Sequence, residues 1–186
     1  MCLLNYFKNP SEAVENFSEE TTLGKIKTSV STMILASVIF AVNTGLGVKI
    51  LEKMPIEITG PEIVTKTIGM GLGKLAAGSF LLVLLGGLFF GCILKTIMNI
   101  LGGEGKYWDG LTTVSFPVLS ASIGILLAMV SSYVPMVGPA LAFIFVAVFF
   151  AVAYSSLFRL SKEMFDVEMI EAFVGVTVFL GIGLIA

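Results

Sequence analysis

The residues that could carry chemistry in this chain are few, and most lie in or beside long apolar stretches. Glu171 stands near the start of the last apolar stretch and is a candidate intramembrane acid, because an ionisable group inside a membrane can mark an ion or solute pathway. The other interpretation places Glu171 at the membrane interface, where a negative charge suits a helix N-terminus. Weaker polar candidates for a pathway are Asn43, Thr44, Ser120, Ser122, Ser155 and Ser156.

An enzyme would need groups that this sequence does not bring together. Histidine does not occur in it, which removes the commonest proton shuttle and metal ligand. Asp109 and Asp166 are far apart and are expected in solvated loops, and Cys2 and Cys92 have no paired spacing and are expected to be free thiols. No glycine run ends in the Lys-Ser/Thr of a phosphate loop. We therefore expect no catalytic, cofactor-binding or metal-binding residues.

The composition indicates that lipid is the main solvent of the chain. Of 186 residues, 56% are hydrophobic and 13% are charged, and the mean hydropathy is +1.01. The net charge is only −2, and the basic residues are scattered singly, which argues against nucleic acid as a partner. The expected partners are the lipid bilayer and either a second copy of the chain or a membrane or cytoplasmic protein.

Long gaps between charged residues predict the membrane spans, because a charge at the bilayer centre costs about 2.5 kcal/mol or more. The expected fold is all-α, a polytopic transmembrane helical bundle of about five spans. Pro135 and Pro139 divide the longest uncharged stretch into two helices. The spans are expected near 28–48, 75–97, 111–131, 139–158 and 169–186, and the last of them is short for a bilayer.

The segments outside these spans set the expected domain organisation and orientation. Residues 1–27 are expected to form a cytoplasmic segment with a short amphipathic helix beginning near Asn9, and residues 49–74 an extracytoplasmic loop with an interfacial helix beginning near Gly60. Basic residues are more numerous on the side of the N-terminus. This bias favours a multi-pass protein of the cell membrane with a cytoplasmic N-terminus and an extracytoplasmic C-terminus.

Three residues within the spans have a predicted structural role. Gly87 and Gly91 form a Gly-x-x-x-Gly pair, which favours close helix packing within the bundle or, alternatively, a homodimer face. Pro117 lies near the start of the third span, where it acts either as a static kink or as the hinge of a moving helix.

The stretch after the second span carries a family resemblance. A helix end is followed by the loop Gly102-Gly103-Glu104-Gly105, the aromatic pair Tyr107-Trp108 and a span with Pro117 near its start. Together with Asn9-Pro10-Ser11-Glu12-Ala13, this pattern resembles the prokaryotic branch of the Yip domain family, the Ypt/Rab-interacting membrane proteins. The Asp-Leu-Tyr-Gly-Pro element and Gly-Tyr pair of eukaryotic members do not occur here, so the resemblance carries no expectation of Rab-type GTPase binding.

The resemblance implies a compact bundle with a cytoplasmic N-terminus and a non-enzymatic role. Its candidate loop determinants are Gly103, Gly105, Tyr107, Trp108 and Pro117. The structural interpretation of the same residues is that the glycines permit a turn with positive φ and that the two aromatic side chains anchor at the membrane interface. The functional hypothesis is a membrane scaffold or adaptor in membrane organisation or trafficking. The alternative is a small transporter or channel for an ion or solute.

Overall fold

The computed structural model describes residues 21–51 and 71–185, and these form five helices with no strand among them. The helices are α3 (Thr22–Leu51), α6 (Leu72–Ile100), α7 (Tyr107–Ser131), α8 (Gly138–Phe165) and α9 (Met169–Ile185). The expected all-α helical bundle is confirmed. The short helices expected near Asn9 and Gly60 lie outside the described residues.

Four of these helices are long and apolar enough to cross a membrane: α3, α6, α7 and α8. Each has 25 to 30 residues, which at about 1.5 Å per residue exceeds the roughly 30 Å of hydrocarbon in a bilayer. Helix α9 has 17 residues and reaches about 25 Å. Helix α9 is the shortest of the five described helices, and the last span was also the shortest uncharged stretch in the sequence.

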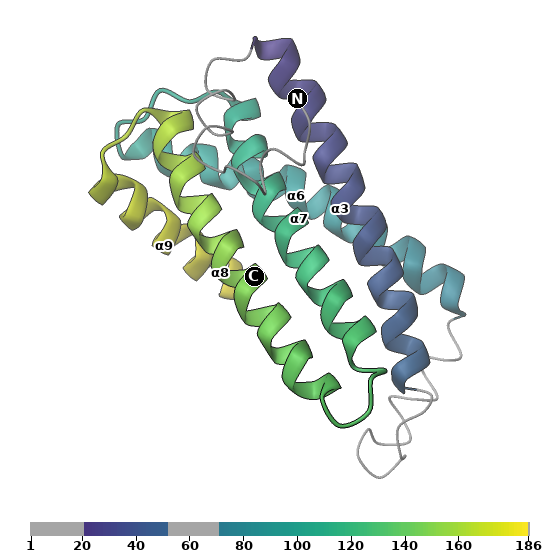
Figure 1. Ribbon diagram of the computed structural model, residues 1–186. Helices are drawn as coiled ribbons and strands as arrows, with labels where there is room; N and C mark the ends of the chain where they lie inside the picture. The colour runs from purple at the N-terminus through teal and green to yellow at the C-terminus, as the bar shows by residue number, and fades with distance from the viewer. Residues whose placement is uncertain (1–20, 52–70, 186) are drawn as a thin grey trace.

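Helix α7 is the centre of the bundle. It packs against α3, α6 and α8, whereas α9 packs against α6 and α8 (Figure 1). Helix α6 crosses obliquely behind α7 in the same view, so that α6 and α8 converge near α9 and diverge toward the α7–α8 turn. The central position explains why α7 has by far the most buried residues of the helices.

The two prolines predicted to divide the longest uncharged stretch lie where α7 gives way to α8, with Pro135 in the turn itself. Pro139 stands in the first turn of α8, where a missing backbone N–H costs nothing because that group would have no helical partner. Gly138 lies against the carbonyl oxygen of Ser131, with room for no side chain between them. The two helices are therefore tightly antiparallel.

An apolar cluster joins α6, α7, α8 and α9 at the end of the bundle that contains the α8–α9 link. Its largest fully buried members include Phe116, Phe165, Leu94 and Met98. Phe179 of α9 packs edge-to-face on Phe90 of α6, with ring centroids 5.8 Å apart. This cluster fixes α9 to the other helices.

Candidate functional site

The loop and the aromatic pair that carried part of the family resemblance lie at one place, which we call the loop junction: residues 101–110 together with Phe165–Glu168. Pro117 lies further along α7, and residues 9–13 lie outside the described part of the chain. The loop leaves α6 through Gly102, whose φ is +99°. Its backbone follows the Schellman pattern, because Gly102 N–H donates to the Asn99 carbonyl at 3.3 Å and Gly103 N–H donates to the Met98 carbonyl at 3.0 Å. The positive-φ position is thus Gly102, and the expectation that placed this role on Gly103 and Gly105 is wrong.

Gly103 and Gly105 are glycines for a different reason, which is the close approach of Phe165. A Cβ atom on Gly103 would lie 3.0 Å from the Phe165 Cβ and carbonyl oxygen, and one on Gly105 would overlap the Phe165 ring. The Glu104 N–H donates to the Phe165 carbonyl at 3.1 Å. The α6–α7 loop is therefore fastened onto the end of α8 by one hydrogen bond, flanked by the close approach of Gly103 and Gly105 to Phe165.

Asp109 is buried, which corrects the expectation of a solvated loop residue. Helix α7 begins at Tyr107, so Asp109 lies in its first turn, and its side chain is only 9% exposed. Oδ1 accepts a hydrogen bond from Lys25 Nζ at 2.8 Å, and Oδ2 accepts the Lys106 backbone N–H at 2.8 Å. The ion pair satisfies the buried carboxylate and ties the start of α3 to the start of α7.

Tyr107 and Trp108 make contacts within the bundle. The Tyr107 hydroxyl donates to the Leu88 carbonyl of α6 at 3.1 Å. The two rings pack edge-to-face, with centroids 5.2 Å apart. Tyr107 therefore fixes the first turn of α7 to α6, and both side chains are half-buried.

Helices α6 and α7 touch through glycine backbones. A Cβ on Gly91 would lie 3.0 Å from the Leu111 Cα, and one on Gly110 would overlap the Gly91 carbonyl oxygen. Gly87, one turn earlier, lies against the side chain of Met33 on α3. The structure places both members of the Gly-x-x-x-Gly pair inside the bundle. Sequence reasoning missed Gly110, because it has no small partner four residues away within its own helix.

A line of buried polar side chains, the α3–α7 seam, continues from the ion pair along these two helices. Ser29 and Thr112 contact each other through their hydroxyl groups, and Asn43 Nδ2 donates to the Ser122 carbonyl at 2.9 Å. Most hydroxyls on α7 also donate to a carbonyl three or four residues earlier in the helix. Three buried side-chain atoms on α3 and α7 have no hydrogen-bond partner: Thr32 Oγ1, Asn43 Oδ1 and Ser120 Oγ.

The other candidates for a polar pathway lie apart from this seam. Glu171 accepts the Glu168 backbone N–H at 3.0 Å and so caps the first turn of α9, in an exposed setting. Ser155 is exposed on α8, and Ser156 is buried and donates to the Val152 carbonyl. Thr44 donates to the Phe40 carbonyl of its own helix. Pro117 is buried in α7 and lines an apolar hollow beside it.

The described residues hold no group of three or more histidine, cysteine, aspartate or glutamate side chains that could bind a metal. Cys92 is an exposed free thiol on α6, and Cys2 lies outside the described part of the chain.

What the loop junction offers is an ordered surface. Its exposed charged residues at the loop and the α8–α9 link are Glu104, Lys106, Asp166 and Glu168.

The four long apolar helices and their packing define a polytopic helical membrane protein. The chain belongs to the Yip1 domain family, whose model matches residues 4–186. Comparison with curated proteins and with solved structures gives no significant match.

Proposed function

We propose that this protein is a non-enzymatic membrane scaffold or adaptor of the Yip type, acting in membrane organisation or trafficking. The observation that carries this proposal is the loop junction. Glu104 and Gly105 against Phe165, and Asp109 against Lys25, fasten three separate parts of the chain into one ordered surface. A rigid surface binds a partner at a lower entropic cost than a loop that must become ordered.

The proposal includes the orientation of the bundle. The described basic residues at the end that contains the loop junction are Lys25, Lys27, Lys95, Lys106, Arg159 and Lys162. Lys49 and Lys74 stand at the opposite helix ends. This distribution supports a cytoplasmic loop junction and N-terminus, an extracytoplasmic C-terminus and residence in the cell membrane. The junction would then face cytoplasmic proteins.

Affinity purification of the full chain from native membranes in mild detergent tests the scaffold proposal. Wild type and the control K49E, at the opposite end, should recover a protein partner in stoichiometric amount. The double variant E104K/K106E, which reverses both exposed loop charges, should lose it. Recovery of neither a partner nor a homo-oligomer would contradict the proposal, as would equal recovery with all three chains.

A transporter is the second candidate, and the unpartnered buried polar atoms of α3 and α7 favour it. Buried hydroxyl and amide oxygens without protein partners can bind water or a solute. Solute flux into proteoliposomes that is lower for Asn43→Leu than for the wild type would support this candidate. Flux that instead disappears in Glu171→Gln would place the pathway at the start of α9. Flux equal to that of empty vesicles in every case would reject transport.

A further inference from the structure

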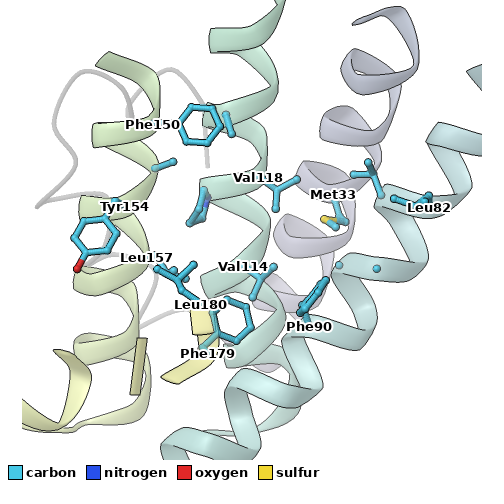
Figure 2. A pocket seen from close by; sticks show the side chains of 16 residues that line it. Met33, Leu82, Phe90, Val114, Val118, Phe150, Tyr154, Leu157, Phe179 and Leu180 are labelled. Atoms are coloured by element: carbon cyan, nitrogen blue, oxygen red, sulfur yellow. The ribbon is translucent and has the colours of Figure 1, made fainter. Parts of the chain in front are cut away.

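An apolar groove lies beside α7, in the wedge where α6 and α8 diverge. Its volume is about 490 Å³, and its lining comes from all five described helices (Figure 2). On α7 it is lined by Val114, Pro117, Val118 and Ala121, which recur at the spacing of one helix face. Phe179 and Leu180 of α9 and Phe90 of α6 close the end next to the apolar cluster.

Small residues create this hollow. Gly86 on α6, Ala121 on α7 and Ala153 on α8 leave space that larger side chains would fill. A Cβ atom built on Gly86 meets no atom within 4 Å. The groove is therefore open at that point rather than tightly packed.

The chemistry of the lining excludes water as a stable occupant. Tyr154 is the only lining residue with a polar group in its side chain. Figure 2 shows its hydroxyl at the far side from Met33 and Leu82. An ordered water needs two to four polar partners, which this surface does not provide.

The surroundings of the groove favour a hydrocarbon chain as its occupant. The groove lies between helices that are long and apolar enough to cross a membrane, and along α6 its lining runs from Leu82 to Phe90, about 12 Å at 1.5 Å per residue. A hydrocarbon chain is narrower than a helix and is the main component of the surroundings at this depth.

We propose that this groove binds the acyl chain of a membrane lipid. The chain enters through the wedge between α6 and α8 and ends against Phe90 and Phe179. Because lipid tails gain no hydrophobic free energy by leaving the bilayer interior, dispersion contacts with the lining drive this binding. This site is separate from the loop junction and does not depend on the scaffold proposal.

Photolabelling of the full chain in phosphatidylcholine vesicles tests the proposal, with a phosphatidylcholine probe that carries a diazirine in its acyl chain. Phe150 in the groove and Val148 on the opposite face of α8 are 50% and 52% exposed, so exposure alone predicts equal labelling. We expect adducts concentrated at Phe150 and Tyr154. A free fatty acid with the same diazirine forms a second arm, and labelling of the groove by the fatty acid but not by the phosphatidylcholine probe would overturn the assignment to a membrane lipid.

Filling the groove gives the decisive comparison. Gly86→Leu should lower the adducts at Phe150 roughly tenfold, which corresponds to about 1.4 kcal/mol of lost affinity. Gly78→Leu is the matched control, because Gly78 also has open space on α6 but does not line the groove. Helix content and gel filtration check the fold, and Ala121→Leu replaces Gly86→Leu if that variant does not fold. The proposal would be overturned by equal labelling of Phe150 and Val148 or by unchanged labelling of Phe150 in Gly86→Leu. Cross-links from the groove to a second copy of the chain would also overturn it.

Discussion

At the scale of single residues, the loop junction depends on close contacts that leave no space for an added methyl group. The Phe165 ring occupies the position that a side chain at Gly105 would take, and the neighbouring Glu104 N–H bonds the Phe165 carbonyl. Phe165 itself is fully buried. The ring and the loop therefore cannot move independently.

Gly105→Ala should destabilise the protein because its methyl group overlaps Phe165. We expect a loss of about 1–3 kcal/mol, as for overpacking of a filled core. Thermal unfolding of the purified protein in detergent measures this loss. Gly181→Ala is the control, because a Cβ there meets nothing within 4 Å, and it should be neutral or slightly stabilising in a helix. Equal unfolding temperatures for both variants would mean that the loop does not pack on Phe165.

The Lys25–Asp109 ion pair gives a second prediction at this scale. Asp109→Asn leaves the Lys25 ammonium without its carboxylate and should cost about 1–3 kcal/mol. Denaturant unfolding followed by circular dichroism measures the change. The control is Glu163→Gln, in an exposed pair whose atoms lie 3.9 Å apart, and it should change stability by no more than about 0.5 kcal/mol. A smaller loss for Asp109→Asn than for Glu163→Gln would show that the carboxylate is solvated.

At the scale of helices, α6 meets α7 and α3 at glycines, and the atom that would obstruct an added side chain differs between these glycines. At Gly110 the obstacle to a side chain is the backbone oxygen of Gly91, whereas at Gly87 it is the flexible end of Met33. A backbone can yield only if a whole helix shifts, and a methionine end can rotate away.

Gly110→Ala should therefore destabilise the bundle more than Gly87→Ala does. We expect a loss of at least about 2 kcal/mol for Gly110→Ala and about 1 kcal/mol for Gly87→Ala. Gly78→Ala, with open space around it, should have no destabilising effect. Unfolding in detergent ranks the three variants. The reverse order for Gly110 and Gly87 would contradict the backbone contact between α6 and α7.

At the scale of the whole molecule, the antiparallel order of α6, α7 and α8 puts the loop junction and the α7–α8 turn at opposite ends of the bundle (Figure 1). In a chain with Cys2 and Cys92 replaced by serine, Glu104→Cys and Val137→Cys report the two ends. An impermeant thiol reagent added to intact cells should label Val137→Cys, and Glu104→Cys only after permeabilisation. Labelling of both from one side would refute a crossing by α7.

The sequence by itself determined that the chain is an all-helical membrane protein, because charges are too costly in hydrocarbon to be placed there without a partner. The gaps between charges and the two prolines where α7 gives way to α8 therefore predicted where the apolar helices stand. Only the tertiary structure decided that Asp109 is buried against Lys25, that Gly110 meets Gly91, and that Gly103 and Gly105 make room for Phe165. These contacts join residues far apart in the chain, and local patterns of residue type carry no information about which distant backbone will approach.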